Sequence, residues 1–350
     1  MKRKFLPIIL CILLFFTVTS SGCSKNSEPV SRTDFYFDTV ITITIYDTDH
    51  LSAEHCDEIL DSCFSLCEVY EKMFSRTKEG SDIWNINHAG GVPVEVHPET
   101  VYLLEKALFF CEQTDGLIDI TIAPVTDLWN FSSEHLLTLQ AEDNPDNHSI
   151  PTKEQLVEFL PHVDYQQVQI QGNTVTLKDA EAALDLGCVA KGYIADCIKT
   201  HLQKQGVSSA LINLGGNIQT LGNKPDGSPF LLGIQKPFQD NSTPVATLPV
   251  TDASLVSSGV YERYFEANGV RYHHLLNPYT GLPENNGLLG VTILTDSSAE
   301  ADILSTAAFL LGLEKGMTFI ESLPDAEAVF LTEDGLLHPT EGISGILQIP

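Results

Sequence analysis

The feature that most constrains the fold is the change of hydrophobic period along the chain. Within residues 35–46, isoleucines at every second position alternate with threonines, which is the period of a strand that buries one face. After Ser52, a residue type that caps helix N-termini, apolar side chains instead recur every three or four residues as far as Tyr70. The chain therefore predicts a β-strand followed directly by a long amphipathic helix.

The rest of the chain continues this mixture without a strict strand–helix–strand repeat. Helices are predicted at 98–111, 152–160, 190–203 and 297–311, the last stopped by Gly312. Strands are predicted at 167–178 (a hairpin), 209–214, 230–235, 247–251, 254–258, 288–295, 328–331 and 345–349. Because no sequence period of 20–50 residues recurs, we expect an α+β layered domain with a mixed sheet, one structural unit over 34–350 with room for two lobes.

The N-terminus carries targeting features. A basic triplet at 2–4 precedes an apolar run at 5–16, which is too short for a spanning helix and is typical of a signal peptide. We therefore expect residues 1–22 to be a signal peptide that directs the protein out of the cytoplasm.

Cys23 follows Ser-Ser-Gly, a pattern that resembles a bacterial lipobox, although Ser20 stands where leucine is usual. We expect Cys23 to be lipidated and residues 23–33 to form a polar tether, so that the protein sits on the extracytoplasmic face of the cell membrane. An ordinary cleaved signal and an uncleaved anchor are the alternatives.

The charge of the chain limits its partners. Nineteen basic residues face 47 acidic ones, for a net charge of −28, which repels nucleic acid and anionic surfaces at long range. A phosphate-bearing substrate would need a cation or backbone donors to offset this field. Three cysteines at helical spacing, Cys56, Cys63 and Cys67, are interpreted as core residues.

Two segments combine charged residues with the backbone geometry that binds anions. Asp119 interrupts the apolar run of 116–129 (GLIDITIAPVTDLW), so its carboxylate is either held by backbone donors or faces a ligand. In 185–196 (DLGCVAKGYIAD), a strand that ends on Asp185 is predicted to turn at Gly187 into a helix that carries Lys191. That arrangement suits a phosphate with a metal nearby, but a helix start with a capping Asp explains it equally well.

Further candidates follow towards the C-terminus. Paired glycines in 213–217 (NLGGN) and the segments 257–264 (SSGVYERY) and 277–283 (NPYTGLP) are typical of tight turns, and tandem histidines precede the last of these. In 299–306 (AEADILST), Asp302 and Thr306 share one helix face and offer hard oxygen ligands for Mg²⁺. Alone, Asp302 is equally typical of an acid that favours a helix N-terminus.

Taken in order, these segments resemble the ApbE family of FAD:protein FMN transferases, over nearly the whole chain after the tether. The resemblance includes FDTVITITI near the start, FSRT and SDIWNIN at 74–87, and the segments quoted above. It implies a Mg²⁺-dependent enzyme that transfers FMN from its substrate FAD to a Thr or Ser hydroxyl of an acceptor protein, with release of AMP. Membrane-bound redox subunits are the acceptors that it implies.

The resemblance also implies roles for individual residues. It places the FAD contacts at Phe37, Thr77, Leu117, Ile118, Asp119, Asp185, Lys191 and Leu276. It places the metal ligands at Cys188, through its carbonyl oxygen, and at Asp302 and Thr306. It implies that Lys191 binds the phosphates and that His274 is a candidate general base. Asn277 stands at a position where Asp is commoner in the family.

Two other functions use the same segments. An FAD pyrophosphatase would use water in place of the acceptor hydroxyl and would release FMN and AMP. A lipid-anchored flavin-binding protein would hold FAD without turning it over. The sequence alone does not separate these from the transferase.

Overall fold

The computed structural model describes residues 28–47, 50–141, 150–238 and 243–350. Its centre is an eight-stranded sheet in which every pairing of neighbouring strands is antiparallel. The strands lie in the order β1 (Val30–Tyr36), β2 (Thr39–Ile45), β6 (Ala210–Leu214), β7 (Asn217–Leu221), β10 (Ser254–Gly259), β13 (Leu288–Thr295), β14 (Ala326–Thr332) and β15 (Leu337–Pro339).

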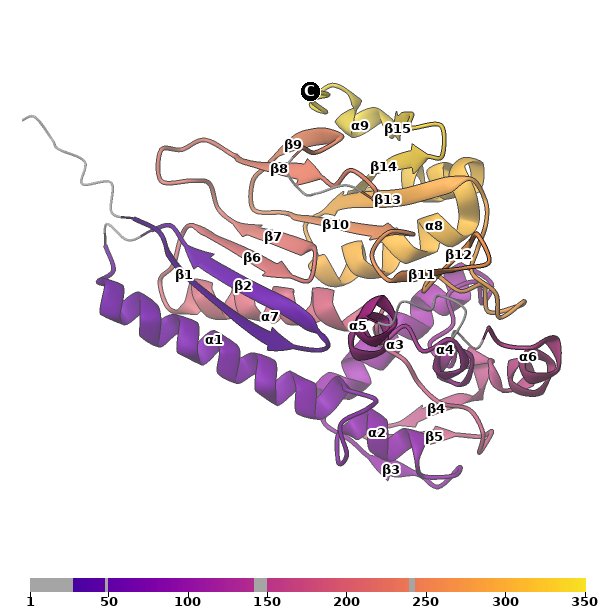
Figure 1. Ribbon diagram of the computed structural model, residues 1–350. Coiled ribbons are helices and arrows are strands. Elements are labelled where there is room, and N and C mark those ends of the chain that lie inside the picture. The colour runs from indigo at the N-terminus through magenta and orange to yellow at the C-terminus, as the bar shows by residue number, and fades with distance from the viewer. Residues whose placement is uncertain (1–27, 48–49, 142–149, 239–242) are drawn as a thin grey trace, which may run out of the picture.

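Long helices cover one face of this sheet, as Figure 1 shows. They are α1 (Ala53–Phe74), α7 (Ala190–Lys204) and α8 (Ser298–Glu321). Ser52 caps α1 by accepting a hydrogen bond from the His55 backbone N–H at 3.2 Å, and Cys56, Cys63 and Cys67 point into the core as expected. The main core lies between these helices and the sheet, and it includes the isoleucines of β2.

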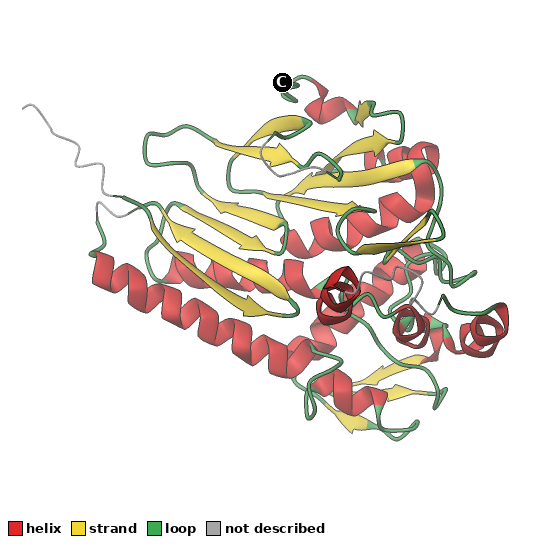
Figure 2. Cartoon of the chain, viewed as in Figure 1, coloured by secondary structure: helices red, strands yellow, loops and turns green. Residues whose placement is uncertain are grey.

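The opposite face of the sheet is covered by a smaller layer. It consists of the hairpin β8 (Phe230–Ile234) with β9 (Ala246–Val250) and of the short helix α9 (Glu341–Ser344), which bury a separate apolar cluster. Figure 2 shows the helices and the strands in separate layers. Helices packed on an antiparallel sheet are typical of the α+β class, and this confirms the predicted fold class.

A second group of elements lies beside the end of the sheet (Figure 1). It contains α2 (Asp82–Asn87), β3 (Val94–Glu95), α3 (Pro98–Gln113), α4 (Ala123–Trp129), α5 (Ser133–Ala141), α6 (Lys153–Phe159), β4 (Val168–Gln171) and β5 (Thr174–Leu177). The hairpin β11 (Tyr264–Ala267) with β12 (Val270–His273) packs against α4 and α6 through an aromatic cluster around Trp129. Because α2, α3 and β5 contribute to the same main core as the sheet and its long helices, this group belongs to the same structural unit.

The structure corrects five details of the sequence prediction. Residues 30–33 of the expected tether belong to β1, because they pair with β2, and the strand predicted at 35–46 is the hairpin of these two strands. Residues 345–349 form no strand, only an isolated bridge from Gln348 to Thr247. At Gly312, with φ of 76°, the helix does not stop but kinks and resumes as the second half of α8. Asp185 follows an isolated bridge at Ala183 rather than a strand. The signal peptide and Cys23 lie outside the described residues.

Candidate functional site

The site is built where the first turns of α7 and α8 meet. The carboxylate of Asp302, on α8, accepts a hydrogen bond from the Gly192 backbone N–H at 3.0 Å and another from Lys191 Nζ at 3.2 Å. Helix α7 has no side-chain cap of its own, so Asp302 satisfies one of its free N–H groups from another helix. Only a glycine fits at position 192, because a Cβ there would lie 2.1 Å from the Ser298 carbonyl oxygen. The close contact of the two helices thus puts a carboxylate, an ammonium and a helix N-terminus at one point.

Hard oxygen donors gather around Asp302. Its side chain is buried, and the Thr306 hydroxyl lies one turn further along α8, 3.5 Å from the Asp302 carbonyl oxygen and 3.2 Å from the Ser258 hydroxyl. The described residues contain no cluster of three or more His, Cys, Asp or Glu side chains suited to a metal. A metal held here would therefore use one carboxylate together with a hydroxyl and a backbone carbonyl, a donor set that fits Mg²⁺ and not a softer ion.

Cys188 lies half-buried in the turn that leads into α7. Burial raises the pKa of its thiol well above the ordinary value, and the neighbouring Cys111, Asp302 and Asp185 raise it further. Burial thus favours the neutral thiol, and the backbone carbonyl of the same turn is the oxygen that the family resemblance assigns to the metal.

Asp185 is held by a partner that sequence reasoning missed. Its Oδ1 accepts from the Gly187 N–H at 2.8 Å, and its Oδ2 lies 3.1 Å from Nε of Arg76, which also binds Asp127 at 2.6 Å. The Gly187 bond fixes the turn before α7, and Arg76 adds a cation beside it. No signal in the sequence links Arg76 to a carboxylate 109 positions further along the chain.

Asp119 takes the first of its two predicted roles. One carboxylate oxygen accepts from the backbone N–H and the hydroxyl of Thr121, at 2.8 and 2.6 Å, and the other accepts from the Tyr165 N–H at 2.9 Å. Burial raises the pKa of Asp119, and these hydrogen bonds oppose the shift. Its neighbour Ile118 and the distant Leu276 are buried in two different apolar clusters, and Leu117 is half-buried.

Phe37 and Thr77 lie in turns outside this hydrogen-bonded centre. Phe37 and Asp38, both with positive φ, form the tip of the β1–β2 hairpin, and Asp38 pairs with Arg263 at 3.2 Å. The hairpin tip is therefore tied to the SSGVYERY segment. Thr77 lies after the end of α1, where its hydroxyl is 3.2 Å from that of Ser75.

His274 faces a carboxylate that sequence reasoning also missed. Its Nδ1 lies 3.3 Å from the Arg263 carbonyl, which can only accept, so Nδ1 carries the proton and Nε2 offers a lone pair. Nε2 lies 3.9 Å from Oε2 of Glu262, and 26% and 34% of these side chains are exposed. Burial, with Arg263 nearby, lowers the pKa of His274 to about 3. Burial raises the pKa of Glu262 to about 7, while Lys191 lowers it and Asp302 raises it.

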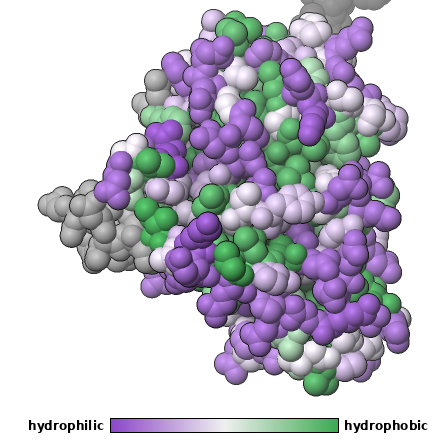
Figure 3. Space-filling view, turned by 90° about the vertical axis from the view of Figure 1, so that its right-hand side faces the viewer, coloured by the Kyte–Doolittle hydropathy of each residue, from purple (hydrophilic) through white to green (hydrophobic). Residues whose placement is uncertain are grey.

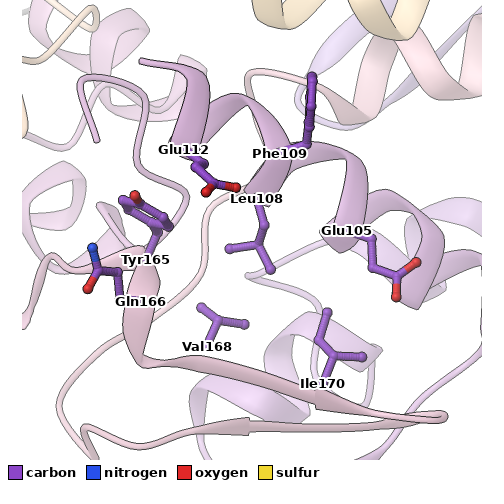
Figure 4. A pocket seen from close by; sticks show the side chains of 8 residues that line it. All are labelled: Glu105, Leu108, Phe109, Glu112, Tyr165, Gln166, Val168 and Ile170. Atoms are coloured by element: carbon purple, nitrogen blue, oxygen red, sulfur yellow. The ribbon is translucent and has the colours of Figure 1, made fainter. Parts of the chain in front are cut away.

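An apolar groove of about 490 Å³ lies elsewhere, between α3 and β4 (Figure 4). Leu108, Phe109, Val168 and Ile170 form its apolar walls, and two glutamates stand at its edge. None of the residues predicted for catalysis or metal binding lines it. Figure 3 shows the side of the molecule that lies on the right in Figure 1. On this side, polar side chains separate the exposed apolar patches.

Comparison with known proteins identifies the family. The sequence model described as "ApbE family" matches residues 37–330. The chain belongs to the ApbE family. An FAD:protein FMN transferase of Treponema pallidum is 32% identical over 96% of this chain and 93% of its own length. One from Klebsiella pneumoniae is 34% identical over 80% and 84%.

Solved structures agree with this assignment. The ApbE protein of Thermotoga maritima superposes with a TM-score of 0.80 at 28% identity, over 91% of this chain and 99% of that one. The flavin transferase ApbE of Vibrio cholerae gives 0.78 at 27% identity, over 91% and 99%. The resemblance read from the sequence is thereby confirmed, and so is the α+β fold expected with it.

The structure brings part of the predicted site together. Lys191, Asp302 and Thr306 lie together in one cluster, and Cys188 lies in the adjoining turn. Asp185 precedes the same turn, and Glu262 connects His274 electrostatically with the Lys191–Asp302 pair. Among the described residues, no hydrogen bond joins Phe37, Thr77, Asp119 or Leu276 directly to that cluster.

Proposed function

We propose that the protein is a Mg²⁺-dependent FAD:protein FMN transferase, which moves FMN from FAD to a Thr or Ser hydroxyl of an acceptor protein. The observation that carries this proposal is the double hydrogen bond of Asp302 to Lys191 Nζ and to the Gly192 N–H. A carboxylate, a cation and a helix N-terminus at one point are what a metal-bound pyrophosphate requires. The names of the family relatives support the same activity.

Asp302, Thr306 and the Cys188 carbonyl would hold the metal. When bound, Mg²⁺ neutralises the pyrophosphate charge and polarises the phosphorus under attack. The chain itself would supply orientation: Lys191 would bind a phosphate oxygen, and the start of α7, which has no side-chain cap of its own, would stabilise the same anion. A local cation is needed because the protein as a whole carries −28.

The reaction exchanges one phosphorus–oxygen bond for another. The acceptor hydroxyl oxygen bonds to the FMN-side phosphorus, the bond from that phosphorus to the bridging oxygen breaks, and AMP leaves with the bridging oxygen. The hydroxyl proton passes to Nε2 of His274, whose lone pair is free. Glu262, whose Oε2 lies 3.9 Å from Nε2, offsets the charge that His274 gains when its carboxyl group is ionised.

An FAD pyrophosphatase is the alternative that uses the same groups. The test is to follow FAD, FMN and AMP in the presence of Mg²⁺, with and without a candidate acceptor. A transferase releases one AMP for each FMN that becomes attached to the acceptor, and it consumes FAD only slowly when the acceptor is absent. Full-rate release of free FMN and AMP without the acceptor would establish the pyrophosphatase, and intact FAD in both reactions would establish a binding protein.

We also propose that the enzyme is anchored by a lipid on Cys23 at the extracytoplasmic membrane face and acts on a membrane redox subunit. Within the described ranges, α8 is long and apolar enough to cross a membrane, but 56% of its apolar window is buried in the fold, as expected of a core helix. A Cys23→Ser variant should move from the membrane fraction to the soluble extract. Unchanged membrane association would argue for an uncleaved anchor.

A further inference from the structure

Asp196, on α7, holds the start of α8. Its Oδ1 accepts from the Ser298 N–H at 2.8 Å and from Nε2 of Gln219 at 2.7 Å. Its Oδ2 accepts from the Ala299 N–H at 3.0 Å and from the Ser297 hydroxyl at 3.0 Å. Ser297 already caps α8 in the ordinary way, through the Glu300 N–H at 3.3 Å. Asp196 therefore acts as a second cap, supplied by a different helix.

The contact between the two helices is reciprocal. Asp196 of α7 binds N–H groups in the first turn of α8, and Asp302 of α8 binds the Gly192 N–H in the first turn of α7. Each carboxylate also faces the positive end of the other helix dipole. Because position 192 touches the Ser298 backbone, the two helices cannot slide without breaking both sets of bonds.

The surroundings leave little to replace Asp196. Gln219 and Ser298 are fully buried, and among the described residues Gln219 Oε1 and Ser298 Oγ have no hydrogen-bond partner. Without the carboxylate, the Ser298 N–H, the Ala299 N–H and the Gln219 amide would also be buried without an acceptor. The start of α8 would then shift, and Asp302 lies just over one turn beyond it.

We infer that Asp196 is a positioning residue for the metal site: it fixes α8 against α7, so that Asp302 and Thr306 face the turn that carries Cys188. This inference rests on the proposed function, because that function assigns the metal to Asp302 and Thr306. Asp196 does not touch the metal. It acts through the helix that carries the ligands, as outer-shell partners of metal sites do.

The test measures divalent-ion affinity directly. Mn²⁺, a hard ion with the same preference for oxygen ligands as Mg²⁺, is titrated into the full chain, and free Mn²⁺ is counted by electron paramagnetic resonance. Asp196→Asn should bind Mn²⁺ about 10- to 100-fold more weakly than wild type. With saturating Mg²⁺, its kcat for FMN transfer should return to within about threefold of wild type, because only positioning is weakened.

Asp82 provides a matched control. It is also a buried carboxylate that ties one helix to the start of another, accepting from the His97 N–H at 2.9 Å and the Thr100 hydroxyl at 2.5 Å. Asp82→Asn should lose stability but keep the wild-type affinity for Mn²⁺. A similar loss of Mn²⁺ affinity in both variants would mean that any loss of stability weakens the site, and it would overturn the inference.

The two proposals fail in different ways. If wild type binds no divalent ion and transfers no FMN, the proposed function is wrong. If wild type does both and Asp196→Asn binds Mn²⁺ as tightly, only the inference is wrong. Should Asp196→Asn not fold, Ser297→Ala is measured instead. It removes the hydroxyl bond to Asp196 and the cap of the Glu300 N–H, both at the start of α8. Mn²⁺ binding should weaken at least about fivefold, the equivalent of one hydrogen bond, and unchanged binding would overturn the inference.

Discussion

At the scale of single residues, the site depends on which oxygen atoms of each side chain can still bind a metal ion. Asp302 shares its carboxylate between Lys191 and Gly192, and both oxygens keep further lone pairs for a metal. Asp119, by contrast, accepts three hydrogen bonds from Thr121 and Tyr165 and has a structural role in this conformation. Two acids in similar motifs thus differ in what they can still bind.

Cys188 should act through its backbone. Mg²⁺ prefers oxygen ligands, and alanine presents the same carbonyl as cysteine. Cys188→Ala should therefore keep FMN transfer within about threefold of wild type, measured as kcat/KM at several Mg²⁺ concentrations. A large loss of activity would mean that the thiol has a role that the geometry does not explain.

His274 should matter for the rate and not for FAD binding. His274→Gln removes the lone pair at Nε2 and should lower kcat about 100- to 10,000-fold, while FAD affinity, read from flavin fluorescence, stays near wild type. Glu262→Gln should have a smaller effect in the same direction, because Glu262 acts through His274. Wild-type kcat in His274→Gln would exclude this histidine as the proton acceptor.

At the scale of elements, the contact between α7 and α8 is the feature on which the site depends. Gly192→Ala would place a Cβ 2.1 Å from the Ser298 carbonyl oxygen. It should lower the free energy of unfolding by at least about 2 kcal/mol and weaken Mn²⁺ binding, since the two helix starts must separate. Urea unfolding and Mn²⁺ titration measure the two effects.

Gly345→Ala is the control for this substitution. A Cβ there would meet no atom within 4 Å, and its φ of −79° is acceptable for alanine. Its stability should change by less than about 0.5 kcal/mol. If Gly192→Ala behaved like Gly345→Ala, the tight contact between the helices would not be real.

Elements and site residues differ in how far the sequence could predict them. Local patterns located α1, α3, α6 and the β4–β5 hairpin, because caps and hydrophobic periods are short-range signals. The motifs also singled out Lys191 and Asp302, which the fold brings within hydrogen-bonding distance of each other. Arg76 and Glu262 were missed because their roles come from contacts with Asp185 and His274, which only the folded chain creates. Asp196 was visible within its motif, but its partners at the start of α8 were not.

At the scale of the whole molecule, stability should depend on pH through buried histidine. Nε2 of His273 donates to the Glu284 carbonyl at 3.1 Å, and its ring packs on Phe309 of α8. Burial, with Arg271 nearby, lowers the pKa of His273 to about 4. An unfolded histidine titrates near about 6.5, so between these values the unfolded state binds more protons.

The free energy of unfolding should therefore fall as pH drops from about 6.5 to about 4, by up to about 3 kcal/mol from His273. The adjacent His274, with its pKa lowered to about 3, adds to the same trend. Urea midpoints measured across this range should decline less in His273→Gln than in wild type, whereas a glutamine at the exposed His88 should leave the decline unchanged. Equal slopes in wild type and His273→Gln would contradict the burial of a neutral ring.

We propose that α7 and α8 together form one metal site, at which FMN passes from FAD to an acceptor protein. The most direct measurement is mass spectrometry of an acceptor protein after incubation with FAD, Mg²⁺ and either wild type or Asp302→Asn. The account predicts an acceptor heavier by one FMN phosphodiester with wild type, AMP in equal amount, and a rate at least about 100-fold lower with Asp302→Asn. Equal labelling by both proteins, or no labelling by wild type while FAD is hydrolysed, would contradict it.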